Sequence, residues 1–278
     1  PDGSWTKEWH QRTIVRPRTR IDHMSILDRI LFQFNSFFSI SKGQNVVSLL
    51  FIIFFLVISY LSMQDKAWTY DEQAHFKYVG YILKGNSNRF DDSKMPVSAW
   101  NVLPAKIARF LPNGSLKAYF EDLLMARLMT ILFSMVMAFT VFHWSRKLYG
   151  VMPAFVSLTL YVLDPNIIAH SQLVTTDVYM MGMMLVSCYW LWRFANSRKS
   201  RDLWMFSLML ALAQLTKYTA LSMYPLFLAA LFIHDLPRWR ADIQMGCSQK
   251  VRREMVMYIQ YIIVIVMVSF VVINAGFL

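Results

Sequence analysis

The segment from Val46 to Met63 contains eighteen residues and no charged side chain. A helix of this length rises about 27 Å, close to the roughly 30 Å hydrocarbon core of a bilayer. The segment is therefore expected to cross a membrane, and this constrains the rest of the chain more than any other feature.

The composition extends this expectation to the whole chain. Of the 278 residues 56% are hydrophobic and 16% are charged, which is typical of a membrane protein with several spans. Six further apolar segments are long enough to be considered: 123–143, 151–168, 178–195, 203–216, 218–233 and 256–276. The sequence thus predicts an all-α polytopic membrane protein with about seven transmembrane helices and a helical extracytoplasmic first loop.

The basic residues indicate the orientation. Eighteen of the 28 Lys and Arg residues lie before the first span or in the loops after the second, fourth and sixth spans. Because basic residues concentrate on the cytoplasmic side, the N-terminus is expected in the cytoplasm. The same pattern explains the net charge of +11, so no nucleic-acid partner is expected.

The chain divides into two expected domains. Residues 1–44 form a cytoplasmic segment, and a capping box at Ser25–Asp28 predicts an amphipathic helix on the membrane surface. Residues 45–278 form the transmembrane module, whose long extracytoplasmic loop covers 64–122. Because the sequence ends within an apolar run, further C-terminal spans are expected beyond it.

The segment 203–216 is unusually short. Fourteen helical residues rise about 21 Å, less than the hydrocarbon core. Lys217 at the following hairpin is therefore expected below the outer membrane surface, where a buried cation needs an anionic partner.

Charged residues from separate segments are expected at this outer face: Asp71, Glu72, Lys94, Arg127, Asp177 and Lys217. Cations can hold a phosphate, and a carboxylate can accept a proton from an attacking group. The arrangement predicts a reaction on a membrane-embedded anionic substrate.

Structural roles remain open for each of these residues. Thr69 and Glu72 fit a capping box, Asp177 can favour a helix N-terminus, and Arg127 can extend to the interface. His75 and His170 have no second ligand at helical spacing, so no metal site is expected.

Four motifs occur in an order that is typical of one family. They are Asp71-Glu72-Gln-Ala-His-Phe, Ala126-Arg127-Leu128, Ala169-His170-Ser171 with Thr175-Thr176-Asp177, and Leu215-Thr216-Lys217. Together they resemble the GT-C glycosyltransferases of the protein O-mannosyltransferase and aminoarabinose transferase type. The resemblance covers residues 45–235.

The resemblance implies transfer of a sugar from a polyprenyl-phosphate donor without a cofactor. It assigns Asp71, in the acidic pair with Glu72, as the base and Asp177 as a second acidic position. Arg127 and Lys217 would hold the lipid phosphate. Many members carry His-Pro-Pro where this chain has Lys94-Met95-Pro96, so Lys94 is expected at the phosphate and the acceptor stays open.

The expected partners are the polyprenyl-phosphate sugar, membrane lipids, an unidentified glycan, lipid or protein acceptor, and further subunits of a membrane complex. The expected location is the bacterial cytoplasmic membrane, or the endoplasmic reticulum in a eukaryote. Two alternatives are weighed: a non-catalytic or truncated structural subunit, and a transporter. No internal repeat supports the transporter.

Overall fold

The computed structural model describes residues 41–64, 66–90 and 96–277. The expected surface helix within residues 1–44 and the side chain of Lys94 lie outside the described residues. Every element in the described part is a helix, which confirms the all-α fold.

The α-helices follow one another along the chain as α2 (Ser41–Gln64), α3 (Tyr70–Leu83), α4 (Leu103–Ala108), α5 (Ser115–Glu121), α6 (Leu123–Tyr149), α7 (Val151–Leu163), α8 (Pro165–Ser171), α9 (Asp177–Ser197), α10 (Ser200–Gln214), α11 (Met223–Gln244) and α12 (Ser248–Phe277). Three short 3-10 helices lie between them: η1 (Ser87–Arg89), η2 (Pro96–Val102) and η3 (Tyr218–Ser222). Each of the seven expected spans overlaps one or more of these helices.

Within the described residues, four helices are long and apolar enough to cross a membrane: Lys42–Gln64, Leu123–Tyr149, Tyr218–Gln244 and Ser248–Phe277. A fifth is added if α7 and α8 form one bent span. α9 and α10 are not among them, and α10 has only 15 residues. On α12, large apolar side chains such as Val266 and Phe270 are exposed, which suits a surface covered by lipid.

The expected span 151–168 is not one continuous helix, because the helix breaks at Asp164. α7 and α8 meet there at an angle of 58°. Pro165 has no N–H to continue the helix, and Asp164 caps α8 by accepting hydrogen bonds from the backbone N–H groups of Asn166 and Ile167 at 2.8 and 3.0 Å. The break directs α8 toward the first turn of α9.

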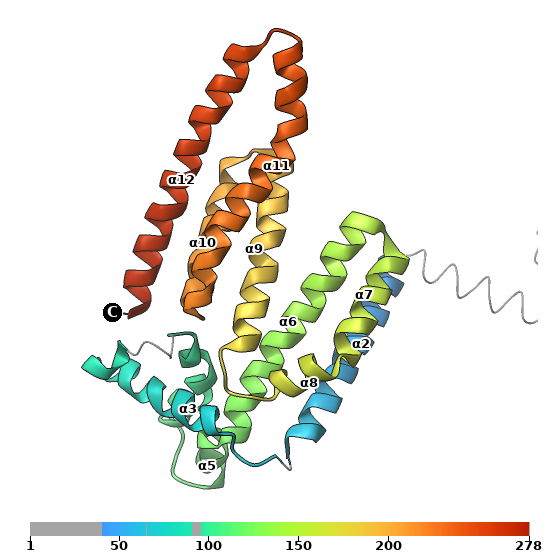
Figure 1. Ribbon diagram of the computed structural model, residues 1–278. Coiled ribbons are helices and arrows are strands. Elements are labelled where there is room, and N and C mark those ends of the chain that lie inside the picture. The colour runs from blue at the N-terminus through green and yellow to red at the C-terminus, as the bar shows by residue number, and fades with distance from the viewer. Residues whose placement is uncertain (1–40, 65, 91–95, 278) are drawn as a thin grey trace, which may run out of the picture. The chain divides into compact units, whose positions relative to one another are not determined.

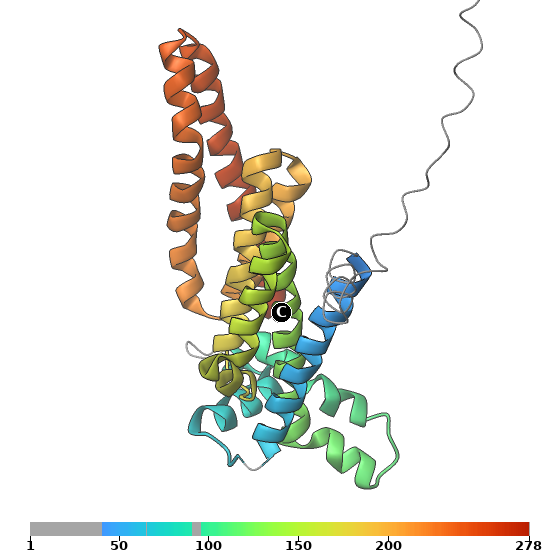
Figure 2. The ribbon, with the colours of Figure 1, turned by 90° about the vertical axis from the view of Figure 1, so that its right-hand side faces the viewer.

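The helices that contain the last two expected spans are longer than the apolar runs in the sequence. α11 continues to Gln244 and α12 already begins at Ser248, so both helices extend beyond the ends of α9 and α10 (Figures 1 and 2). Ion pairs between Arg238 and Glu254 and between Lys250 and Asp242 link the two helices there. These ion pairs account for the charged residues in the parts of α11 and α12 that extend beyond the apolar runs.

The long helices pack around two apolar cores. α2, α6 and α7 surround one, and α9 to α12 surround the other (Figure 1). α6 and α9 approach closely where Gly182 faces Phe133, since a Cβ at Gly182 would lie 2.5 Å from the Phe133 ring. α3, α5 and α8 lie near the first turns of α6 and α9 (Figure 1).

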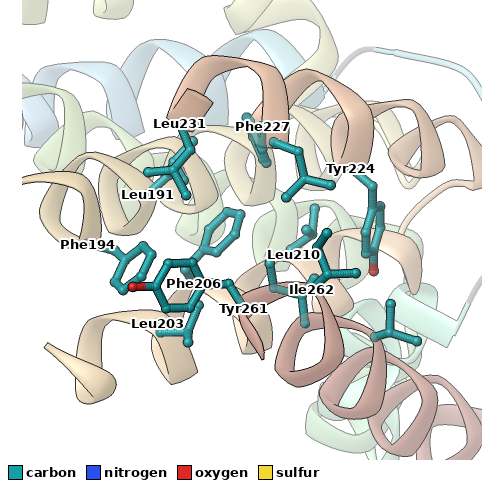
Figure 3. Close-up of a pocket in the computed structure, with 13 residues that line it drawn as sticks. Leu191, Phe194, Leu203, Phe206, Leu210, Tyr224, Phe227, Leu231, Tyr261 and Ile262 are labelled. Carbon is teal, nitrogen blue, oxygen red and sulfur yellow. The ribbon is translucent and has the colours of Figure 1, made fainter. Parts of the chain in front are cut away.

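The second core contains an apolar pocket of about 160 Å³, shown in Figure 3. Side chains such as Phe206, Phe227 and Tyr261 point into it from α10, α11 and α12. None of the described side chains that line it is charged, so it suits apolar groups and offers no acid or base for chemistry.

Candidate functional site

The Glu72 half of the predicted capping box is present at the start of α3. The carboxylate Oε2 of Glu72 accepts hydrogen bonds from the Thr69 backbone N–H at 3.0 Å and from its hydroxyl at 3.1 Å. The helix ends at Gly85, whose φ of +61° is a left-handed conformation that glycine adopts without strain. These two signals fix where α3 begins and ends.

Glu72 also forms a buried ion pair with Arg127 of α6. Arg127 Nε donates to Glu72 Oε1 at 2.8 Å and Arg127 Nη2 donates to Glu72 Oε2 at 2.7 Å. The two side chains are 1% and 0% exposed. Glu72 Oε1 accepts a further hydrogen bond from the Val174 backbone N–H at 3.1 Å. This bidentate pair joins α3 to α6 and to the loop before α9.

The remaining donors of Arg127 are occupied too. Nη1 donates to the carbonyls of Met63 and Lys66 at 3.3 and 2.8 Å, and Nη2 donates to the carbonyl of Ala67 at 2.9 Å. Arginine has five N–H donors, and all five are therefore satisfied within the protein. Arg127 holds the segment between α2 and α3, and this arrangement leaves no N–H for the phosphate contact expected from the sequence.

The partners of Glu72 set its protonation state. Burial raises the pKa of the Glu72 carboxyl, but hydrogen bonds from Arg127, Thr69 and Val174 outweigh burial and leave the pKa below its ordinary value. Glu72 is therefore ionised and fully engaged, which suits a structural anchor rather than a proton acceptor.

Asp71, the neighbour of Glu72, lies in a different environment. Its side chain is exposed, and within the described part of the chain it has no hydrogen-bond or ion-pair partner. It lines a pocket of about 570 Å³, here called the α3 pocket. The pocket is formed by Tyr70, Asp71, Gln73, Ala74, His75, Lys77, Thr175, Thr176, Asp177 and Lys217.

Asp177 and Lys217 meet in this pocket. Lys217 Nζ lies 2.8 Å from Asp177 Oδ1, and the two side chains are 45% and 46% exposed. His170 Nδ1 of α8 lies 3.9 Å from Asp177 Oδ2. An ammonium has three donors, so after the bond to Asp177 Lys217 can still donate to an anion in the pocket.

Lys77 is a pocket residue that the sequence analysis missed. Its side chain is exposed and has no hydrogen-bond or ion-pair partner among the described residues. Tyr70, Ala74 and Lys77 follow the i, i+4, i+7 spacing of one helix face, and this periodicity could have identified it. The α3 pocket therefore contains two lysines and two aspartates.

Asn101 of η2 links the first loop to α6 and α9 through side-chain hydrogen bonds. Its amide donates to the Ala126 carbonyl and to the Thr130 hydroxyl at 2.8 Å each, and it accepts a hydrogen bond from the Tyr179 hydroxyl at 3.0 Å. Val97 N–H donates to the Leu215 carbonyl at 3.1 Å, two residues before Lys217. No sequence signal marked Asn101, because its partners are 25 to 78 residues away.

The described residues contain no group of three or more His, Cys, Asp or Glu side chains that could hold a metal ion. His75 lines the α3 pocket, and His170 lies beside Asp177. Cys188 and Cys247 are both free thiols.

The sequence matches the model of a known protein family. The model of a family described as dolichyl-phosphate-mannose-protein mannosyltransferase matches residues 119–273, more than half of the chain. Arg127, Asp177 and Lys217 lie inside the matched range, whereas Asp71 and Glu72 precede it. No curated protein and no solved structure matches the chain.

Proposed function

We propose a donor, a site and a reaction step for this chain, which belongs to the dolichyl-phosphate-mannose-protein mannosyltransferase family and is a membrane glycosyltransferase of the mannosyltransferase type. It moves a sugar from a polyprenyl-phosphate donor to a hydroxyl group of an acceptor in the α3 pocket. Asp71 takes the proton of that hydroxyl, and Lys217 binds the donor phosphate.

One observation carries this proposal: an unpaired carboxylate and a partly available ammonium line the same pocket. Asp71 has no partner among the described residues, and Lys217 keeps donors beyond its bond to Asp177. A base for the acceptor and a cation for the leaving group are the two groups that such a transfer needs.

The proposed step is one displacement at the anomeric carbon. The acceptor oxygen forms a bond to this carbon while the bond from the carbon to the phosphate oxygen breaks. The electron pair of the broken bond leaves with the polyprenyl phosphate, and the acceptor proton passes to Asp71. The products are the glycosylated acceptor and polyprenyl phosphate.

Lys217 stabilises the negative charge that grows on the departing phosphate, and Lys77 supplies a second cation in the same pocket. Asp177 keeps Lys217 in place through their 2.8 Å contact. Asp177, the second acidic position of the family pattern, therefore orients Lys217 and does not act on the acceptor. Because phosphate is already an adequate leaving group, the proposal includes no metal or cofactor.

We place the pocket on the extracytoplasmic side of a bacterial cytoplasmic membrane, or of the endoplasmic reticulum in a eukaryote. The distribution of basic residues supports this orientation. Lys94 stays a candidate phosphate contact from the sequence alone.

The donor site is tested by replacing Lys217 with methionine, which keeps the length of the side chain and removes its charge. Hydrogen bonds to charged groups are strong, so binding of polyprenyl phosphate to the purified protein should weaken about 10- to 100-fold. Lys106→Met is the control, because Lys106 of α4 is an exposed lysine outside the pocket lining. Equal donor binding by both variants would place the phosphate elsewhere.

The orientation is tested with a membrane-impermeant thiol reagent. A cysteine introduced at the exposed Ser115 should react in intact cells, whereas the exposed Cys247 should react only after permeabilisation. Labelling of Cys247 from outside would reverse the orientation and move the α3 pocket to the cytoplasmic side.

A further inference from the structure

A second pocket adjoins the α3 pocket along the same helix. It has a volume of about 510 Å³ and is called the Tyr81 pocket here. Its lining residues are Ala74, Lys77, Tyr78, Tyr81, Ser87, Asn88 and Phe90. Ala74 and Lys77 line both pockets, so the two cavities meet at these residues of α3, where Ala74 carries only a methyl group.

The Tyr81 pocket offers polar groups that are not used within the protein. The Tyr81 hydroxyl and the Asn88 side-chain amide have no hydrogen-bond partner in the described part of the chain. The backbone of Asn88 is fixed, because its N–H donates to Asn86 Oδ1 at 2.9 Å. A side-chain amide with free donors and an acceptor, on a backbone held in this way, is suited to binding hydroxyl groups.

The pocket also offers aromatic surface. Tyr81 is 38% exposed and Phe90 is 64% exposed. The Phe90 ring stacks on Phe277 with centroids 6.0 Å apart, which holds it in place. Exposed aromatic rings beside a free amide form a surface with one apolar side and one polar rim.

We propose that the Tyr81 pocket is the acceptor subsite and that it binds a sugar ring of a saccharide acceptor. This inference rests on the proposed function and adds the chemical class of its acceptor. A sugar ring has an apolar C–H face for Tyr81 and Phe90 and hydroxyl groups for Asn88 and Lys77. Since Ala74 lies one helical turn from Asp71, a ring at this junction presents a hydroxyl to the base.

A peptide acceptor fits this surface less well. The free groups of the Tyr81 pocket come from side chains that are spaced around one cavity. This arrangement favours a compact ring with several hydroxyl groups over an extended chain.

The test is ligand-observed saturation-transfer NMR on the purified full chain in detergent, with a panel of methyl glycosides and a Ser/Thr-containing peptide as probes. At least one glycoside should receive saturation from the protein. Tyr81→Ala and Asn88→Ala should each weaken its binding about 3- to 10-fold, the effect of one neutral hydrogen bond or ring contact. Tyr149→Ala, which removes a tyrosine that is 73% exposed at the end of α6, should bind like the parent.

A blocking variant gives a second measurement. Ala74→Leu fills the junction of the two pockets and should lower sugar transfer to the bound glycoside more than it lowers glycoside binding. Both results together support the inference.

The inference is overturned if no glycoside binds, or if the glycosides bind equally to the parent and both pocket variants. It is also overturned if the peptide alone binds and loses binding in those variants, because the acceptor is then a protein. Donor binding by the same variants, measured with polyprenyl phosphate, should stay unchanged. It reports separately on the phosphate site at Lys217.

Discussion

Replacing Asp71 with asparagine should lower the rate of sugar transfer by about 10²- to 10⁴-fold, the usual contribution of a positioned general base. The amide has the shape of the carboxylate but cannot accept the acceptor proton. Because Asp71 is exposed and has no partner among the described residues, its loss should leave folding and donor binding unchanged. Transfer of labelled sugar from polyprenyl phosphate, measured beside thermal unfolding, separates the two effects.

Glu121→Gln is the matched control for Asp71. Glu121 is an exposed carboxylate of the same loop, at the end of α5 and outside the pocket lining. Its loss should leave transfer unchanged. If Asp71→Asn also transfers sugar at the parental rate, the acidic pair has no catalytic part, and the structural-subunit alternative becomes the better account of the chain.

The second large effect is expected on stability. Arg127→Met leaves the Glu72 carboxylate buried without its partner, and loss of one member of a buried pair costs about 3–5 kcal/mol. Glu72→Gln should destabilise for the converse reason, because it leaves the Arg127 guanidinium buried without a counter-charge. The thermal unfolding midpoint should therefore drop in both single variants, and the double variant should recover part of the loss.

The same pair predicts a dependence of stability on pH. The pKa of Glu72 is lowered in the folded state, so the stability it contributes is present above the ordinary carboxyl pKa of about 4.3 and is lost as the pH falls through the lowered value. Glu72→Gln should lack this part of the acid dependence. If both single variants unfold like the parent at every pH, the pair does not anchor α3.

The helices were predictable because their signals are local. Continuous apolar runs marked the long helices, and Thr69, Glu72 and Gly85 marked the ends of α3. The break at Asp164 was missed, although a proline directly after a capping residue is a local signal for the start of a new helix.

The different roles of Asp71 and Glu72 were not predictable from the sequence. Asp71 and Glu72 are adjacent in sequence, yet the helix turns one toward the α3 pocket and the other toward Arg127. Arg127 is 55 residues from Glu72, and no local pattern shows that its donors are all satisfied inside the protein. The sequence placed Arg127 beside Lys217, but only folding decides which cation remains available.

The position of the donor phosphate tests the central claim most directly. A polyprenyl phosphate that carries a photoreactive group beside its phosphate would be cross-linked to the full chain, and the modified peptides would be identified by mass spectrometry. We expect labelling within Tyr70–Lys77, Thr175–Asp177 and the hairpin at Lys217. Labelling should be lost in Lys217→Met and should remain unchanged in Lys106→Met. Labelling confined to the apolar surface of α12, and equal in both variants, would contradict the account.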